Sequence, residues 1–190
     1  MKLLIPMVLA CALVPLSCSR QENAQANASP SPQLAAAATK LKIDACTLLT
    51  ARELESVQGE ALQTTQGSGQ VIERLSTEQC YFALPTQSNS VVLTVTQPAD
   101  ASGVAELKST WQEMFHKPKA VEQEGGKKKE PPLKVEGIGD EAFWAGNDQI
   151  GALYVLTGES YIRISVGGGG RAGEKLDKSK TLAGFVLGHL

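Results

Sequence analysis

Few residues of this 190-residue chain have the type and spacing needed for catalysis. The chain contains two histidines, His116 and His189, each near the end of a predicted helix. A catalytic histidine needs a nucleophile beside it, and no serine or cysteine can be tied to either one from the sequence. The carboxylates Asp140 and Glu141 are adjacent, so on a strand they would point to opposite faces. Surface or helix-capping roles are therefore the commoner interpretation, and no enzyme activity is indicated.

Two glycine-containing motifs begin like functional sites and do not complete them. Residues 168–173 match the dinucleotide-binding spacing G-x-G-x-x-G, but the following strand and the acidic residue for a ribose are missing. Glu174 stands where a phosphate-binding loop needs lysine. Gly158-Glu159-Ser160 begins like a nucleophile elbow, but Ile162 occupies the position of its last glycine. We interpret residues 168–173 as a flexible loop and expect no cofactor.

The N-terminus is typical of an exported protein. Lys2 is followed by an apolar run over residues 3–16 that is too short for a permanent membrane span. Leu16-Ser17-Cys18 resembles the lipobox of bacterial lipoproteins, with Pro15 where an aliphatic residue is usual. The resemblance implies removal of a signal peptide over residues 1–17 and lipid attachment at Cys18 through acyl chains such as palmitate. The alternative is ordinary cleavage near this point, which would leave a secreted protein with a spare thiol.

Two cysteines remain beyond the anchor, Cys46 and Cys80. An even pair in an exported domain predicts a disulfide. It would close a loop of about 35 residues, worth about 3 to 4 kcal/mol in the chain-entropy model. A metal site is the weaker alternative, because neither cysteine has a second cysteine or a histidine at ligand spacing.

Composition separates a tether from a folded body. Residues 18–40 are polar and rich in alanine, serine and proline, which predicts a flexible tether. Residues 41–190 have the length of one domain. Without residues 1–17 the chain keeps 17 basic and 20 acidic residues, which excludes a nucleic-acid binder of the usual basic kind.

Periodicity predicts the elements of the body. Thr50 and Glu53 form a capping box for a short helix that ends at Gly59. Strands are expected over residues 79–84 and 91–96, and apolar spacing predicts an amphipathic helix over residues 104–115 with Trp111 and Phe115 in the core. Residues 117–134 carry prolines, glycines and a lysine run, which predicts a flexible insert. A docking patch for anions is the alternative there.

The C-terminal part contains the strongest hairpin signal. Residues 150–156 and 161–166 are strand-like runs on either side of Thr157-Gly158-Glu159-Ser160. Ile162, Ile164 and Val166 alternate with Tyr161, Arg163 and Ser165, so one face should be buried and the other solvated. A helix is expected over residues 178–190.

The stretch over residues 135–144 connects the insert to these strands. Gly137 and Gly139 permit positive φ values or a close approach, and Asp140 could close the turn with its side chain. Phe143 and Trp144 then supply apolar area for burial. The pattern predicts an α+β fold with an antiparallel sheet and helices packed on one face. Residues 81–115 and 154–186 both read as two strands and a helix, which permits a duplicated ββα unit.

These segments resemble a known group of proteins. Cys46 with the following helix, Cys80-Tyr81 and the Gly-Ile-Gly-Asp-Glu-Ala-Phe-Trp stretch at residues 137–144 are similar to bacterial envelope lipoproteins of a domain-of-unknown-function family common in actinobacteria. The resemblance implies a single α+β domain with one disulfide, presented on a lipid tether. It implies no catalytic residues.

The sequence therefore predicts a lipid-anchored binding or interaction module of the cell envelope. It would face the periplasm or the exterior, at the outer membrane if the host has one, and its partners would be the membrane and an envelope protein. The alternatives are an envelope hydrolase with an unrecognised site and an assembly factor of an envelope complex. A deep pocket with convergent polar groups would favour the hydrolase, and a large exposed apolar patch would favour the assembly factor.

Overall fold

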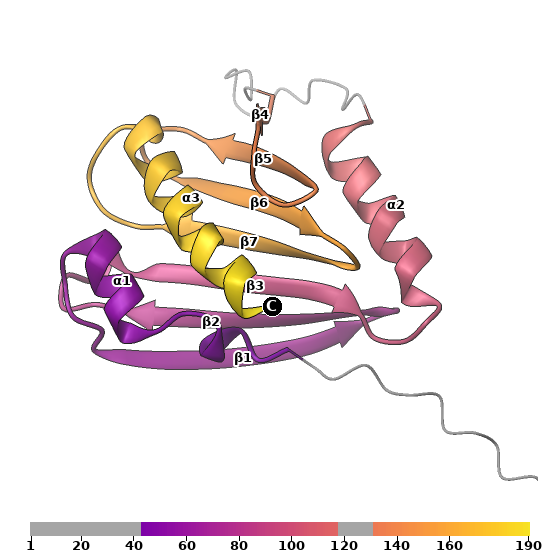
Figure 1. Cartoon of the computed structure of the whole chain (residues 1–190), viewed down its shortest axis with the longest axis horizontal. Helices are drawn as coiled ribbons and strands as arrows, with labels where there is room; N and C mark the ends of the chain where they lie inside the picture. Colours follow the sequence, from indigo (N-terminus) through magenta and orange to yellow (C-terminus); the bar gives the residue numbers. More distant parts are fainter. Residues whose placement is uncertain (1–42, 118–130) are drawn as a thin grey trace, which may run out of the picture. The chain divides into compact units, whose positions relative to one another are not determined.

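A computed structural model describes residues 43–117 and 131–190 of the chain (Figure 1). The predicted signal peptide, the tether with Cys18 and most of the predicted insert lie outside these residues. The elements of the described part are, in chain order, η1 (Ala45–Thr47), α1 (Ala51–Gln58), β1 (Thr64–Ile72), β2 (Leu75–Ala83), η2 (Gln87–Asn89), β3 (Val91–Pro98), α2 (Gly103–Phe115), β4 (Leu133–Val135), β5 (Glu141–Gly146), β6 (Gly151–Thr157), β7 (Ser160–Val166) and α3 (Ala172–His189).

The strands form one seven-stranded sheet in the order β1-β2-β3-β7-β6-β5-β4. Every neighbouring pair is antiparallel. The predicted α+β class with an antiparallel sheet and packed helices is confirmed. β3 and β7 meet at the centre, so they join the strands that precede α2 to those that follow it (Figure 1).

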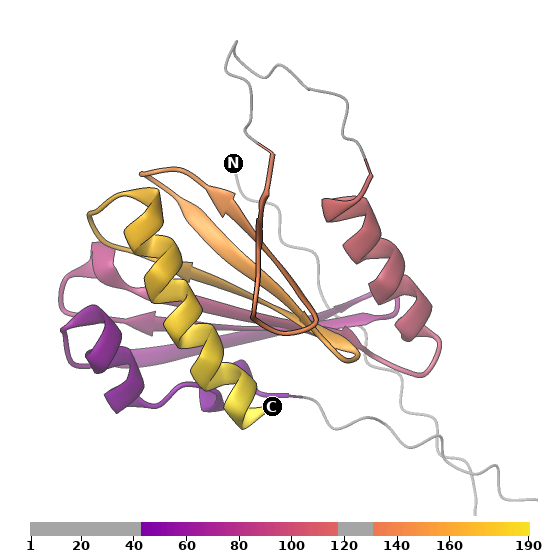
Figure 2. The ribbon, with the colours of Figure 1, turned by 45° about the horizontal axis from the view of Figure 1, so that its top comes forward.

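One face of the sheet, which we call the core face, carries α1 and α3 (Figures 1 and 2). Ile162 and Ile164 of β7 point to this face and pack with Leu182 and Val186 of α3 in one buried cluster. The capping box predicted for α1 is present, because Thr50 Oγ1 accepts from the N–H of Glu53 and Glu53 Oε2 accepts from the N–H of Thr50. Both helices thus cover this face as predicted.

The second face is partly covered by α2. Trp111 of α2 lies 5.7 Å from Tyr161, ring centroid to ring centroid, and Phe115 stacks on Phe143 at 4.6 Å. Tyr161 and Phe143 alternate with the core residues Ile162 and Trp144, and successive side chains of a strand point to opposite faces. α2 and α3 therefore lie on opposite sides of the sheet, so the expected packing of helices on one face holds for α1 and α3 and not for α2.

The positions of α2 and α3 on opposite faces argue against a symmetric duplication of the ββα unit. The order of two strands and a helix occurs twice, as β2-β3-α2 and β6-β7-α3. A two-fold axis that exchanged the antiparallel strands β3 and β7 would stand perpendicular to the sheet and would leave both helices on the same face. The two units share an element order and are not packed equivalently.

The stretch over residues 135–144 forms a fixed corner. Gly137 and Gly139 have φ values of +80° and +58°. A Cβ at Gly139 would lie 2.5 Å from the carbonyl oxygen of Leu156, so the corner rests directly on β6. Asp140 was expected to close its own turn with its side chain. Its Oδ2 instead accepts from the N–H of Gly158 in the β6–β7 turn at 2.6 Å.

Several elements differ from the sequence prediction, and β2 begins at Leu75, four residues before the expected start. β1 was not predicted, and β4 begins inside the predicted insert 117–134, where Leu133 and Lys134 pair with β5. α3 begins at Ala172, six residues earlier than expected, which removes the end of the predicted glycine loop. Asp148 explains this early start, because its Oδ1 accepts from the N–H of Ala172 at 2.7 Å.

Candidate functional site

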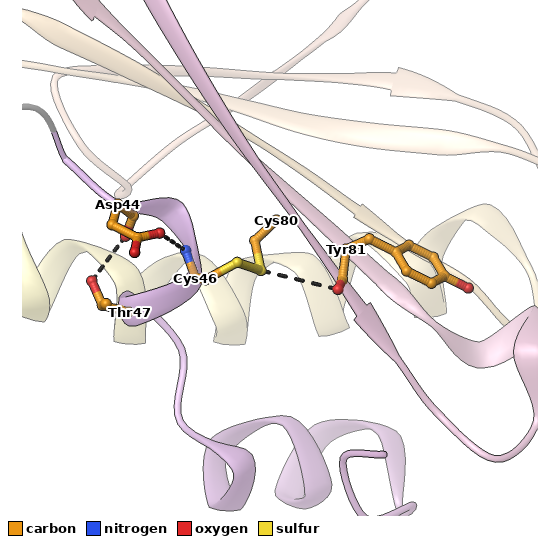
Figure 3. Close-up of a disulfide and its surroundings, with 5 residues drawn as sticks. All are labelled: Asp44, Cys46, Thr47, Cys80 and Tyr81. Atoms are coloured by element: carbon orange, nitrogen blue, oxygen red, sulfur yellow. Dashed lines mark hydrogen bonds between the residues drawn. A yellow bond between two sulfur atoms is a disulfide. The ribbon is translucent and has the colours of Figure 1, made fainter. Parts of the chain in front are cut away.

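The predicted disulfide joins Cys46 and Cys80 with an S–S distance of 2.04 Å. Figure 3 shows that it connects η1 to β2, and that the Tyr81 side chain points away from it. Cys80 is fully buried in the core-face cluster. The bond therefore ties the chain before α1 to the sheet, and it belongs to the part of the molecule that stabilises the fold. Cys18 lies outside the described residues.

Each histidine is paired with a carboxylate. His116 Nε2 lies 2.8 Å from Glu141 Oε2, and His189 Nε2 lies 3.6 Å from Glu53 Oε1. Among the described residues, no hydroxyl or thiol is hydrogen-bonded to either imidazole. Thr50 Oγ1 donates to Glu53 Oε2 rather than to His189. These pairs act as contacts between elements.

The glycine segment after β7 is packed against the chain. A Cβ at Gly167 would lie 2.1 Å from the carbonyl oxygen of Ser88, and Gly168 lies close to Asn89. Gln58 at the end of α1 donates to the carbonyl oxygen of Asn89 and accepts from Lys178 Nζ at 3.0 Å. The glycines thus allow close packing between η2 and the start of α3.

A row of polar side chains crosses the second face, as the strand register shows. It begins at the free edge and ends at the aromatic residues below α2. Each member lies opposite the next on the neighbouring strand. We call it the polar row, and its members are Ser68, Gln79, Thr94, Arg163 and Tyr154.

Arg163 is the central group of the polar row. Its side chain is half-buried, its Nε donates to the hydroxyl oxygen of Tyr154 at 3.2 Å, and its guanidinium carbon lies 5.8 Å from the centroid of the Tyr154 ring. None of the ion pairs between described residues involves Arg163. A guanidinium held by a ring keeps further donors in a planar fork, which suits a carboxylate or another oxyanion.

The aromatic cluster closes one end of the polar row. Phe115 lies 5.3 Å from Tyr154, so the residue that holds Arg163 is itself held by α2. Ring contacts between 4.6 and 6.1 Å connect the members of this cluster, which are Trp111, Phe115, Phe143, Tyr154 and Tyr161.

Glu141 fastens α2 to this face. Trp111 Nε1 donates to Glu141 Oε2 at 2.7 Å, beside the contact from His116. Burial raises the pKa of Glu141, but the hydrogen bonds from Trp111 and His116 and the charges of His116 and Lys134 outweigh it and hold this pKa below its ordinary value. The carboxylate is therefore charged at neutral pH and anchors α2.

Two shallow hollows lie at the free edge of the sheet, between β1 and β2, and the larger one also reaches Asp44 and Glu78 on the core-face side. One has a volume of about 390 Å³ and the other about 290 Å³. Ser68, Gly69 and Gln79 line both of them. The lack of side chains at Gly67 and Gly69 leaves room for other groups, since Gly67 lies against the sulfur of Cys46 and Gly69 lies below the carboxylate of Glu78.

A deep pocket with convergent polar groups would favour the hydrolase, and a large exposed apolar patch would favour the assembly factor. The two hollows are shallow and polar, and the large exposed apolar side chains are dispersed, at Val71, Ile72, Leu133, Ile150 and Leu190. No group of three or more metal-ligating side chains is present within residues 43–117 and 131–190. The helices within the same ranges are not long and apolar enough to cross a membrane.

Sequence reasoning identified Arg163 only as one residue of a solvated face. The alternation of residues 161–166 gave its side of the sheet correctly, but the partners across β2, β3 and β6 depend on strand register. No protein-family model matches the chain, and no match is found among curated proteins or among solved structures.

Proposed function

We propose that this protein is a non-catalytic binding module of the bacterial cell envelope, anchored by lipid at Cys18. The apolar run over residues 3–16 and the Leu-Ser-Cys sequence at residues 16–18 support the export and the anchor. The disulfide between Cys46 and Cys80 is consistent with an oxidising compartment. The polar segment over residues 18–40 would then hold the domain away from the membrane.

The polar row is the surface that this module uses, and its ligand carries a carboxylate or a comparable oxyanion. The observation that carries this proposal is Arg163, a half-buried cation on an accessible sheet face with neutral neighbours in Thr94 and Tyr154. Leaving a cation partly desolvated costs free energy that an anionic ligand would offset. Tyr154 fixes the guanidinium in advance, which lowers the entropy lost on binding.

The ligand surface is tested with a short oligoglutamate peptide as the probe. We expect the full chain to bind it, and we expect Arg163→Gln to weaken binding about tenfold or more, because a charge-assisted contact is lost. Arg52→Gln in α1 is the matched control, since it removes the same charge from an exposed position elsewhere. Equal binding by the two variants would contradict the assignment of the polar row.

The anchor is tested by intact-mass spectrometry of the membrane-extracted protein, with and without reduction. We expect a chain that starts at Cys18, carries acyl chains and gains two hydrogens on reduction. The variant Cys18→Ser should leave the membrane fraction. An unacylated wild-type chain in the soluble fraction would contradict the anchor while leaving the polar row untouched.

A further inference from the structure

The outer edge of β1 is open over its whole length. All nine residues of Thr64–Ile72 are exposed, and within the described residues only β2 pairs with this strand. The register with β2 runs without interruption from Thr64 opposite Ala83 to Ile72 opposite Leu75, so no bulge bends the strand away. Its outward N–H and C=O groups are therefore arranged to accept another strand.

The opposite edge of the sheet lacks this property. β4 has three residues, includes Lys134 and directly follows Pro131 and Pro132. A short length, a lysine and neighbouring prolines are the devices by which proteins prevent edge-to-edge pairing. β1 has none of them, because residues 62–72 contain no charged residue and no proline. One edge is protected and the other is not.

We propose that β1 is a self-association edge, at which a second copy of this chain adds its own β1 in antiparallel orientation about a two-fold axis at Ser68. The sequence of β1 is complementary to itself in this register. Gln66 lies opposite Gln70 of the second copy, and their side-chain amides can pair. The glycines of the two copies lie opposite each other, so the backbones approach without obstruction.

The ends of β1 fit the same arrangement. Val71 and Ile72 are 61% and 58% exposed. In the two-fold register they lie opposite Thr65 and Thr64 of the second copy, whose methyl groups would cover part of this apolar surface. β1 itself carries no charged side chain, but the Glu78 carboxylate of each copy lies over its own Gly69 and Asp44 lies beside the same stretch. Acidic groups of the two copies would therefore stand on either side of the new strand pair, and their repulsion would weaken the pairing at low salt.

The size of this contact predicts a weak dimer in dilute solution. One pair of nine-residue strands buries less area than a stable interface needs. Confinement of both copies to one membrane would raise their effective concentration and favour the pairing. This last step rests on the proposed lipid anchor, whereas the complementarity of β1 does not.

The pairing is tested in cells with the full chain carrying Ser68→Cys. A residue on the two-fold axis lies opposite itself within the Cα separation of a disulfide. Ser68 and Gln79 lie on the second face and Cys80 on the core face, so exchange with the native disulfide is disfavoured. We expect several-fold more disulfide-linked dimer than for the control Lys134→Cys at the protected edge, with mass spectrometry placing the link between the two introduced cysteines.

Charge variants in the Ser68→Cys chain then test the register. Gln66→Lys with Gln70→Lys places like charges opposite each other at two points and should reduce the dimer at least fivefold. Gln66→Lys with Gln70→Glu places opposite charges there and should restore it. The proposal is overturned if the two double variants cross-link equally, if Ser68→Cys gives no more dimer than Lys134→Cys, or if it links to a different protein.

Repeating the cross-linking experiment with Cys18→Ser distinguishes the effect of the lipid anchor from the pairing of β1. If the anchor proposal holds, this change should lower cross-linking at equal expression without abolishing the difference between the two charge variants. If the wild-type chain proves to be unacylated, Cys18→Ser should leave cross-linking unchanged, and that charge-variant difference still decides the pairing.

Discussion

The two faces of the sheet bury their residues in different ways. The core face is a continuous apolar layer, closed by α1 and α3 and tied to η1 by the disulfide. The second face has an aromatic cluster at one end, below α2, and the polar row over the remainder. Free energy of folding is therefore concentrated on one side, and the other side retains side chains that can exchange water for a ligand.

The largest difference is expected between two neighbours on β2. Phe82 is fully buried on the core face, while Tyr81 is half-buried on the second face. Phe82→Ala should lower the free energy of unfolding by about 3 to 5 kcal/mol, because it leaves a large cavity. Tyr81→Ala, the matched control, should cost about 1 kcal/mol or less. Urea denaturation measures both, and similar losses would contradict the division of the faces.

Removal of the disulfide should have the next largest effect. The paired changes Cys46→Ala and Cys80→Ala release a loop between positions 34 apart, which is worth about 3 to 4 kcal/mol by loop entropy. Thermal unfolding with and without a reductant measures this. The wild type under reducing conditions should match the double variant, and a large remaining difference would show that the alanines disturb the packing around Cys80.

A smaller effect is expected for Glu141, which holds α2 on the second face. Glu141→Gln should cost about 1 to 3 kcal/mol at pH 7, the range for hydrogen bonds to a charged group. Because the folded pKa of Glu141 lies below its ordinary value, its contribution is present above the unfolded pKa and is lost as pH falls through the folded one. The loss of stability between pH 7 and pH 3 should therefore be smaller in Glu141→Gln than in wild type.

The exposed carboxylate of Glu136 provides the control for this comparison. In Glu136→Gln the loss of stability between pH 7 and pH 3 should stay close to that of the wild type, measured by urea denaturation at each pH. If Glu141→Gln behaves in the same way as Glu136→Gln, the contacts from Trp111 and His116 do not stabilise the folded state through this carboxylate.

The smallest effect on stability is expected within the polar row. Arg163→Gln should change the free energy of unfolding by about 1 kcal/mol or less, because the lost hydrogen bond to Tyr154 is partly offset by removal of a half-buried charge. The same variant should show the largest loss of oligoglutamate binding. A strongly destabilised Arg163→Gln protein would instead make Arg163 a structural residue and would remove the main support for the ligand surface.

The sequence predicted those elements whose capping, turn or apolar residues lie close together in the chain. The capping box at Thr50, the hairpin turn at Gly158 and the apolar spacing around Trp111 each depend on residues close in sequence, and each is present. β1 gave no signal, because residues 63–70 contain no apolar residue and the strand is held mainly by backbone pairing to β2.

The arrangement around Arg163 could not be predicted for a different reason. The hairpin predicts Tyr154 opposite Arg163, but the packing of Phe115 on Tyr154 requires that α2 cross to the second face. The amphipathic pattern of α2 gives its buried side and does not specify which face of the sheet it covers. Side-chain alternation is local information, whereas the choice of face is decided by the whole fold.

The central pairing of β3 with β7 has a consequence for the order of folding. Both neighbouring hairpins, β2–β3 and β6–β7, join strands that are adjacent in sequence and should form early. β3 and β7 pair residues 65 to 75 positions apart, from Thr96 opposite Tyr161 to Val91 opposite Val166. The entropy cost of closing so long a chain segment arises before the contacts that offset it have formed. Docking of the two halves along this seam should therefore set the refolding rate, and substitutions within it should slow refolding more than those at either edge.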